Sequence, residues 1–523
     1  MFTAWIDARN GSGASVYLQR SNILNPKLFA DTGVLVTFSS NSKGNLSMIS
    51  DGSGGVIVVW QENNDLYAKR FNSSGTPVWN ADKLLTVNTA GTQSGPVMTV
   101  VNSTQAMVAY VEGKNNFTGG TGNDIYVQKI DLATGNTLLA IDTPVCRAPL
   151  NQTAIQITAD GTGGAFICWQ DPRVATTNTS IYAARVNNDG LLASGWNTDG
   201  NAICTEAGNQ NSPVMVSDNN GGAYITWLDF RQSASNGDIY AQRLTASGSV
   251  VWATNGVPVN RNIGSQTLPQ ILAVNDGAIL CWTDPRLSTS NRDIYAQKIS
   301  LNTGDTLWAP SGGGVLICDA PDQQTPSTSD GLKMITDGSN GAIIIWVDQR
   351  NNTANNYDLY AQKVNSSGVV QWASNGVVVS NNSGRQGSVI GGEYIAGTNG
   401  AMVVWQDGRS GTTSGEIYGA LISGDGNLTS LVRDRQPLEG KIKLYPIPAT
   451  TQLQIALSDV KPGAYLIQVI DVNGRILSQQ RNQFNGTTGL LQTKVEQLQR
   501  GMYYLRLVHE SSKTESLFNF QKL

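Results

Sequence analysis

The chain has 523 residues, 14% of them charged, with a formal net charge of −4 and a hydrophobic content of 40%. This length allows several domains, and the lack of a basic block argues against nucleic acid as a partner. No stretch of about 18 apolar residues occurs, so the sequence predicts no membrane-spanning helix.

The first nine residues, Met1–Arg9, already belong to a repeat and show neither the basic segment nor the cleavage site of a secretory signal peptide. We therefore expect that the numbering begins at a processed or trimmed start, or that the gene model is truncated.

Eight copies of one pattern run through residues 1–432. Each copy has an apolar run that ends in Trp-x-Asp-x-Arg or a variant of it, a polar loop, and a run of the type Asp-Ile-Tyr-Ala-Gln-Lys/Arg. The mean period is about 57 residues, and a fixed period of this size indicates a repeat architecture. The copies are anchored at Trp5, Trp60, Tyr110, Trp169, Trp227, Trp282, Trp346 and Trp405.

One copy, residues 212–260, reads as a four-stranded antiparallel meander whose tight turns contain Gly and Asn. No helical periodicity appears in the repeats. The sequence therefore predicts an all-β protein with a β-propeller. Because the first copy starts at its second strand, an eight-bladed ring with an incomplete first blade fits best. A seven-bladed ring with one unit outside it and an open array are the alternatives.

The Trp-x-Asp-x-Arg motif has a structural and a functional interpretation. The structural one is an Arg–carboxylate pair that holds a blade to its loop or to its neighbour. The functional one is a ring of carboxylates around a ligand or a metal ion. We favour the structural interpretation, because catalysis needs one asymmetric site and not six identical ones. The residues assigned to the structural motif are Trp5, Asp7, Arg9, Trp60, Trp169, Asp171, Trp227, Asp229, Trp282, Asp284, Trp346, Asp348, Trp405 and Asp407.

The twelve Trp residues all fall into two repeat positions. Seven are anchors, and a periodic aromatic residue is first a packing residue. This weakens the case for a sugar-binding platform made of Trp. The other five are predicted on the fourth strand of their units: Trp79, Trp196, Trp252, Trp308 and Trp372.

The sequence predicts no cofactor, no catalytic residue and no metal ligand. The single histidine, His509, lies outside the repeats, and no Cys-x-x-Cys pair occurs. The five cysteines, an odd number, are interpreted as small buried residues, with their disulfide pairing left open. Turns such as that beginning at Asp51 lack the spacing of a calcium loop, which leaves only a weakly held structural Ca²⁺ open.

The loop after each anchor is the most variable part of the unit, and all of these loops are predicted on one rim of the propeller. This rim is the candidate surface for a glycan or protein ligand. The candidate binding residues on it are Lys114, Asn115, Asn116, Arg173, Arg231, Arg286, Arg350 and Arg409.

The repeats stop near residue 432, residues 433–440 read as a linker, and residues 441–523 have the alternation of a small Ig-like β-sandwich. This last segment resembles the type A C-terminal sorting domain of proteins exported by the type IX secretion system of Bacteroidota, although Ile447 stands where that family usually has Asn. The propeller resembles, more loosely, the repeat ectodomains often joined to such domains. The resemblance to the sorting domain is carried by Tyr445, Pro446, Pro448, Gly463, Tyr465, Gly474, Gly501 and Tyr503.

The resemblance implies contact with the type IX secretion machinery through residues 441–523, and export to the outer surface or exterior of a Gram-negative bacterium. We expect a non-catalytic module for binding or adhesion, or a component of a surface assembly, with self-association left open. A polysaccharide-degrading enzyme or accessory module is the first alternative, because paired carboxylates cannot be recognised from sequence. A structural subunit of an extracellular filament or appendage is the second.

Overall fold

The computed structural model describes residues 1–9, 15–22, 28–30, 32–86, 91–113, 122–139, 143–175, 178–288, 291–309, 313–325, 331–351, 357–382, 384–409, 416–429, 441–471, 476–511 and 514–523. These residues form two compact units, of which one contains the repeats and the other the C-terminal domain. Every regular element among them is a β-strand, which confirms the all-β prediction. The proposed linker, residues 433–440, lies outside the described residues, so the domain boundaries stay predictions.

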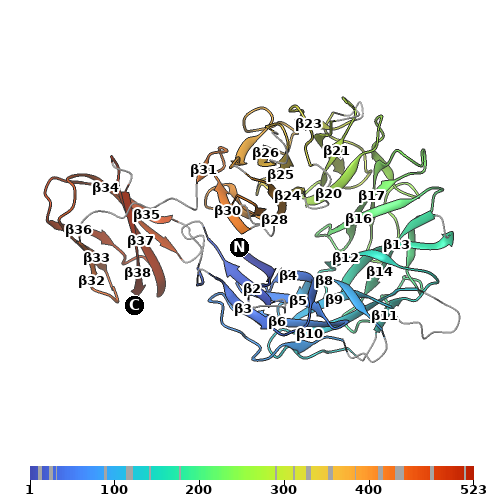
Figure 1. Cartoon of the computed structure of the whole chain (residues 1–523), viewed down its shortest axis with the longest axis horizontal. Helices are drawn as coiled ribbons and strands as arrows, with labels where there is room; N and C mark the ends of the chain where they lie inside the picture. Colours follow the sequence, from blue (N-terminus) through green and yellow to red (C-terminus); the bar gives the residue numbers. More distant parts are fainter. Residues whose placement is uncertain are drawn as a thin grey trace. The chain divides into compact units, whose positions relative to one another are not determined.

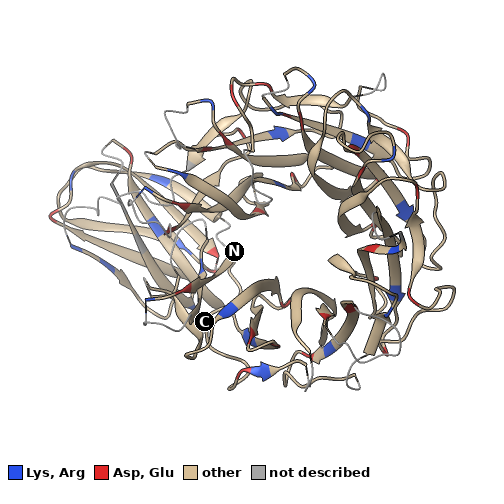
Figure 2. Ribbon diagram, turned by 45° about the vertical axis from the view of Figure 1, so that its right-hand side comes forward, with Lys and Arg blue, Asp and Glu red and all other residues tan. Residues whose placement is uncertain are grey.

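The repeats form eight antiparallel sheets in sequence order, and Figure 1 shows them as successive blades of a propeller. Seven sheets have four strands and the first has three, as predicted for a ring with an incomplete first blade. We number the blades 1 to 8 in chain order. Figure 2 shows the positions of acidic and basic residues, which are interspersed along the ribbon of the blades.

Each complete blade runs from an inner strand through the anchor strand and a third strand to an outer strand. The inner strands are β4 (Lys43–Ser50), β8 (Gln93–Asn102), β12 (Thr153–Ala159), β16 (Gln210–Ser217), β20 (Thr267–Val274), β24 (Leu332–Thr336) and β28 (Gln386–Ile395). The anchor strands are β1 (Phe2–Asp7), β5 (Val56–Glu62), β9 (Gln105–Glu112), β13 (Ala165–Ala175), β17 (Ala223–Asp229), β21 (Gly277–Asp284), β25 (Ala342–Asp348) and β29 (Gly400–Asp407).

The third and outer strands complete the blades. The third strands are β2 (Ser15–Arg20), β6 (Asp65–Phe71), β10 (Asp124–Asp131), β14 (Asn178–Val186), β18 (Asp238–Leu244), β22 (Asp293–Ser300), β26 (Asp358–Val364) and β30 (Glu416–Ile422). The outer strands are β3 (Val34–Phe38), β7 (Lys83–Leu84), β11 (Thr143–Cys146), β15 (Asn201–Cys204), β19 (Val257–Asn260), β23 (Val315–Cys318), β27 (Val377–Ser380) and β31 (Leu428–Thr429).

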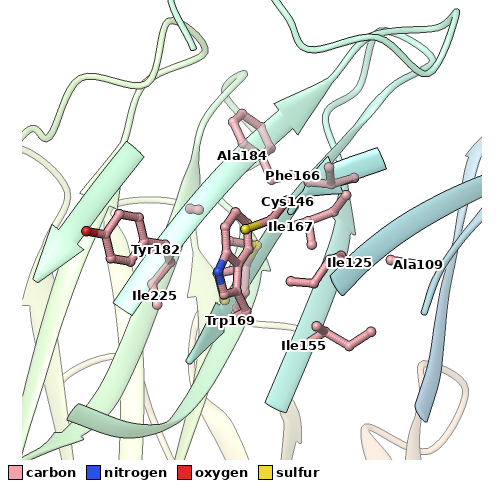
Figure 3. Packing of buried hydrophobic residues seen from close by; sticks show 14 of the residues in the cluster. Ala109, Ile125, Cys146, Ile155, Phe166, Ile167, Trp169, Tyr182, Ala184 and Ile225 are labelled. Atoms are coloured by element: carbon pink, nitrogen blue, oxygen red, sulfur yellow. The ribbon is translucent and has the colours of Figure 1, made fainter. Parts of the chain in front are cut away.

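The anchor strands other than β1 are largely buried on both faces. Every residue of β17 and β25 is buried, because neighbouring blades cover both sides of the sheet. Figure 3 shows this packing around Trp169, whose cluster takes Ile125 from blade 3 and Ile225 from blade 5. The apolar core is therefore repeated between the blades.

The five non-anchor Trp residues differ in position from the prediction, because they lie in the segment before the outer strand and not on it. The indole of Trp252, for example, packs against Gly304 in the last turn of blade 6 and donates a hydrogen bond to Leu301 O at 3.3 Å. We call this packing of one blade on the turn glycine of the next the turn-glycine contact. It recurs as Phe29–Gly75, Trp79–Gly135, Leu139–Gly190, Trp196–Gly248, Trp308–Gly368 and Trp372–Gly426.

Replacing Gly304 with Ala should destabilise the propeller for two reasons. The residue has a φ of +73°, and an added β-carbon would lie 2.8 Å from Cδ2 of Trp252. Gly221→Ala is the matched control, because Gly221 has a similar φ of +82° and open space around it. Backbone strain of about 1–2 kcal/mol is common to both variants. The free energy of unfolding in urea should fall further for Gly304→Ala, and equal losses would contradict this packing.

The C-terminal unit is a sandwich of two antiparallel sheets, as predicted. One sheet has the order β32 (Lys441–Tyr445), β33 (Gln452–Ser458), β36 (Gly489–Lys494). The other has the order β35 (Ile476–Phe484), β34 (Gly463–Asp471), β37 (Gly501–His509), β38 (Thr514–Lys522). Leu453, Tyr465 and Leu505 belong to the core between them. Among the described residues, no helix is long and apolar enough to cross a membrane.

Candidate functional site

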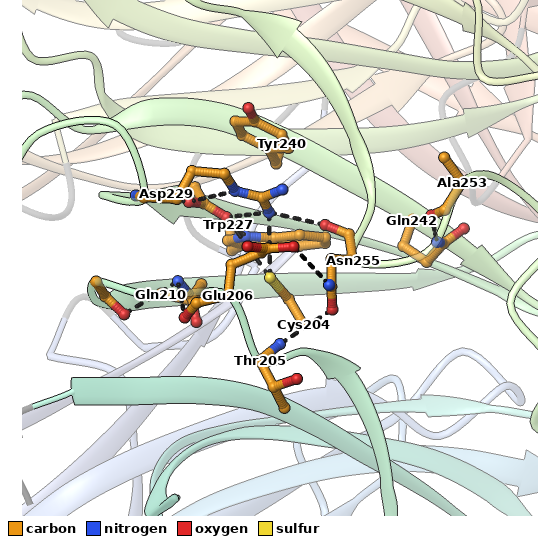
Figure 4. A network of polar contacts seen from close by, with 12 residues as sticks. Cys204, Thr205, Glu206, Gln210, Trp227, Asp229, Tyr240, Gln242, Ala253 and Asn255 are labelled. Carbon is orange, nitrogen blue, oxygen red and sulfur yellow. Dashed lines mark hydrogen bonds and ion pairs between the residues drawn. The ribbon is translucent and has the colours of Figure 1, made fainter. Parts of the chain in front are cut away.

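The end of each anchor strand carries a polar cluster, seen in Figure 4 for blade 5. Asp229 closes β17 and is fully buried. The indole of Trp227 donates to Oδ2 of this carboxylate at 2.8 Å, and Arg231 donates to both of its oxygens at 2.8 and 2.6 Å. A buried carboxylate paired with a guanidinium in two places is a strong, directional interaction.

Arg231 also connects this cluster to its surroundings. It donates to Asn255 O at 2.8 Å within blade 5, and its guanidinium lies 4.0 Å from the ring centroid of Tyr240. It also contacts Sγ of Cys204, on the outer strand of blade 4, at 3.1 Å. Burial alone would lower the pKa of Arg231, but the hydrogen bond to Asp229 and the electrostatic interactions with neighbouring groups together outweigh it and leave the pKa raised. The side chain therefore holds its charge in an internal contact between two blades.

The same pair occurs in the other blades that have the complete motif. The shortest Arg–Asp distances are 2.5 Å for Arg173–Asp171, Arg286–Asp284 and Arg409–Asp407, and 2.6 Å for Arg350–Asp348. Each of these guanidinium groups lies within 4.0 Å of a Tyr ring centroid. The candidate rim arginines are thus held inside the blades. The other candidates, Lys114, Asn115 and Asn116, lie outside the described residues.

Blades 1 and 2 show variants of the cluster. In blade 1 Asp7 pairs with Arg9, whose Nε lies 2.7 Å from Oδ2, but this arginine is exposed. The hydrogen bond from Arg9 lowers the pKa of Asp7 to about 2. In blade 2 the Trp60 indole donates to Glu62 at 3.2 Å, and Lys43 of the inner strand takes the place of the arginine at 3.2 Å.

Three cysteines belong to these clusters. The sequence analysis interpreted them only as small buried residues and did not predict this contact. Cys146, Cys204 and Cys318 end the outer strands of blades 3, 4 and 6, and each contacts the arginine of the next blade. Burial raises the pKa of each of these thiols to about 12. All five cysteines are buried and free. The thiols are therefore neutral partners of the ion pairs.

A set of acidic residues that sequence reasoning missed begins the third strands. Asp238 lies opposite Asp229 in the β17–β18 register and is 5% exposed. Burial, followed by the charge of Asp229, raises the pKa of Asp238 to about 6. Burial likewise raises the pKa of Asp124 and of Asp293 to about 6. The sequence signal for these residues is the repeated Asp-Ile-Tyr. Its Ile and Tyr indicate a β-strand, and the Asp before them was therefore interpreted only as part of that strand.

The raised pKa of these carboxyls predicts a pH effect on stability. Asp238 and its equivalents bind a proton in the folded protein up to about pH 6 and in the unfolded chain only up to about pH 4. Their contribution is therefore complete below about pH 4 and is lost as pH rises through about 6. The thermal midpoint should be higher at pH 5 than at pH 7.5. A triple variant with Asn at Asp124, Asp238 and Asp293 should show a smaller difference, and an unchanged one would contradict the assignment.

Carboxylates at the opposite ends of the blades cap turns. Oδ1 of Asp218 accepts hydrogen bonds from the backbone N of Asn220 and of Gly222 at 2.8 and 2.7 Å, and Oδ2 pairs with Arg243 at 2.7 Å. Asp51 and Asp160 have the same arrangement. The described part of the chain contains no group of three or more His, Cys, Asp or Glu side chains that could hold a metal ion.

Most of the described motif residues of the C-terminal unit contribute to its packing or to its backbone conformation. Tyr465 is buried and donates to Lys461 O at 2.6 Å, and Tyr503 donates to Gln499 O at 2.9 Å. A β-carbon at Gly463 would collide with the His509 ring, so only glycine fits there. Gly501 opens β37, Gly474 lies outside the described residues, and Tyr445 is 42% exposed. Pro446 and Pro448 each follow a cis peptide bond.

Residues 443–518, which make up most of this unit, match the family of secretion system C-terminal sorting domains. The chain is a type IX secretion cargo. The recognition of a sorting domain from its sequence is thereby confirmed. This cargo is exported to the cell surface or the extracellular space, and its sorting domain contacts the type IX machinery.

Other comparisons give remote likenesses to the cargo. No curated protein matches it. An endo-arabinase from Bacteroides thetaiotaomicron has a TM-score of 0.29 at 11% identity, covering 49% of this chain and 94% of that one. PorZ of Porphyromonas gingivalis has a TM-score of 0.22 at 9% identity, covering 98% and 85%. The β-propeller domain of the Trilobed protease from Pyrococcus furiosus has 0.35 at 9%, covering 76% and 100%. At this level none of them bears on the activity of the cargo.

Proposed function

We propose that the propeller of this cargo is a non-catalytic binding module, presented outside the cell, whose ligand surface is formed by the loops after the anchor strands. The ligand is a glycan or a protein. The proposal depends on one observation, namely that the repeated charged residues pair with one another within the propeller. Arg231 and its equivalents are held by buried carboxylates and Tyr rings, which leaves the non-repeating loops as the parts that differ from blade to blade.

The composition of these loops supports the same proposal. The described loop of blade 5 runs from Arg231 to Gly237, and Gln232, Ser235 and Asn236 in it are exposed. Uncharged hydrogen-bonding side chains of this kind suit hydroxyl-rich or peptide ligands. Since the loop of blade 5 joins two buried strands, β17 and β18, its side chains should need little further ordering on binding.

The test is binding of the purified full chain to a glycan array and to cell-surface protein extracts, followed by variants. Ala at Gln232, Ser235 and Asn236 together should weaken any binding found. Ala at Ser53 and Ser339 is the matched control, since these exposed serines lie in inner hairpin turns that leave the other ends of the strands. Equal binding by both variants would place the ligand elsewhere, and no binding to any glycan or protein would overturn the proposal.

One observation favours the enzymatic alternative. A carboxyl group with a pKa of about 6, such as that of Asp238, is partly protonated near neutral pH, as the general acid of a glycoside hydrolase must be. The carboxyl groups of Asp124 and Asp293 also have a pKa of about 6. This repetition is typical of a structural position that occurs in several blades, and it counts against a single catalytic acid. Release of reducing ends from a polysaccharide panel, abolished by Asp238→Asn, would decide for the enzyme.

A further inference from the structure

Positive charge is concentrated in the sorting domain of this cargo. Residues 441–523 contain 10 Lys and Arg against 5 Asp and Glu, which gives a formal net charge of +5. Residues 1–440 contain 25 Lys and Arg against 34 Asp and Glu, a net charge of −9, so the total of −4 combines two parts of opposite sign. A part of a protein with an excess of one charge attracts partners of the opposite charge from a distance.

Part of this excess lies on the outer face of the β32–β33–β36 sheet. Leu453, Ile455 and Leu457 of the central strand belong to the core of the sandwich, so the residues that alternate with them point outward. The register places the outward residues of all three strands in common rows, of which one is Lys443, Ala456 and Leu490. The basic sheet face, as we call it, includes Lys441, Lys443, Tyr445, Leu490, Gln492 and Lys494.

The charge of the basic sheet face has one sign. Its three lysines are exposed, and the strands that form the sheet contain no Asp or Glu. The acidic residues nearest to them in the sequence, Asp459 and Glu496, lie in the connections that follow β33 and β36. The other sheet differs, because Arg481 of its edge strand pairs with Glu510 at 2.6 Å. The positive charge of the domain is thus partly neutralised on one sheet and gathered on the other.

Two apolar side chains are exposed among these lysines. Leu490 is 57% exposed and shares its row with Lys443, whereas Tyr445 lies in the next row, opposite Gln454. The short side chain of Ala456 separates Lys443 from Leu490, which leaves low relief between the two edge strands. An exposed Leu and Tyr with polar and charged neighbours is the composition of a protein-binding surface, in which apolar contacts lie inside a polar rim.

We infer that the basic sheet face is the surface by which the sorting domain docks on the type IX machinery, and that the docking component presents acidic side chains around an apolar contact. The sorting domain contacts that machinery, and the inference assigns the contact to one of its two sheets. Opposite potentials on the two surfaces speed their encounter and disfavour partners of like charge. The inference is independent of the loop surface proposed for the propeller.

The test is export of a double charge reversal, Lys443→Glu with Lys494→Glu. Its exported fraction should fall by about tenfold or more, with accumulation in the periplasm, because like charges at a docking surface repel. Lys461→Glu with Arg500→Glu is the matched control. It makes the same change in charge at exposed residues of the connections beside the sheet, and it should be exported normally.

Two further variants separate charge from fold. Lys443→Arg with Lys494→Arg keeps the charge and should be exported normally, whereas Gln at both positions should give an intermediate exported fraction. Because both lysines are exposed, the thermal midpoint of each purified variant should equal that of the unaltered chain. A loss of export in the Arg variant would contradict a role for charge.

The purified full chain shows whether the basic sheet face is accessible and what it binds. Acylation by an amine-reactive reagent, followed by mass spectrometry, should modify Lys443 and Lys494 at rates close to those in the urea-unfolded chain. Protection of both would mean that another part of the chain covers the face, which would overturn the inference. Normal export of the charge reversal, or an equal loss in its control, would also overturn it. So would binding to phosphatidylglycerol vesicles that the reversal abolishes, because the partner would then be a membrane.

Discussion

Removal of residues 441–523 is expected to abolish export and leave the propeller in the periplasm. The reason is that the segment matching the sorting-domain family lies within these residues, and it forms a folded sandwich with a core of its own. The measurement is cell fractionation followed by immunodetection of the propeller in the periplasmic, outer-membrane and medium fractions. Export at the normal level would contradict the sorting function.

A point variant tests whether export requires the sorting domain to be folded, and not only its residues to be present. Tyr465→Ala removes a fully buried ring and its hydrogen bond to Lys461 O, at an expected cost of about 3–5 kcal/mol, and should also reduce export. Ser478→Ala is the control on the same sheet, because Ser478 is exposed on β35. Its export should equal that of the unaltered chain.

Asp229→Ala should destabilise the propeller by about 3–5 kcal/mol, because it leaves the buried Trp227 N–H and the charge of Arg231, whose side chain is only 16% exposed, without their main partner. Asp7→Ala is the matched control in blade 1. The same pair there is far more accessible, with side chains 33% and 19% exposed for Arg9 and Asp7, so the loss should be about 1 kcal/mol or less. Thermal unfolding of both variants provides the comparison. Equal losses would show that burial does not set the strength of these pairs.

The sequence predicted the architecture well because the signals for it are local and repeated. The anchor strand and the third strand recur eight times, and the inner strand with its turn recurs seven times, so a misreading of one copy is corrected by the others. The incomplete first blade was visible for the same reason, as the absence of one strand before Trp5. The sandwich followed from alternation and from motif residues such as Tyr465.

The polar clusters were less predictable because they depend on contacts between neighbouring blades. The approach of Cys204 to Arg231 joins the end of one blade to the loop of the next, and no spacing in the sequence indicates it. The raised pKa of Asp238 depends on how fully neighbouring strands exclude water. Trp252 was assigned to the fourth strand because its sequence neighbours are apolar. Its ring instead packs on the turn of the following blade and donates a hydrogen bond to Leu301 O there.

The turn-glycine contact has a consequence for the way the propeller comes apart. Each contact couples a blade only to the next one, so the cooperativity of the array is that of a linear chain with nearest-neighbour terms. Among the described residues, blades 1 and 8 take part in one such contact each, whereas every other blade takes part in two. Thermal fluctuations should therefore detach these terminal blades first and spread inward, while the middle blades keep their protection.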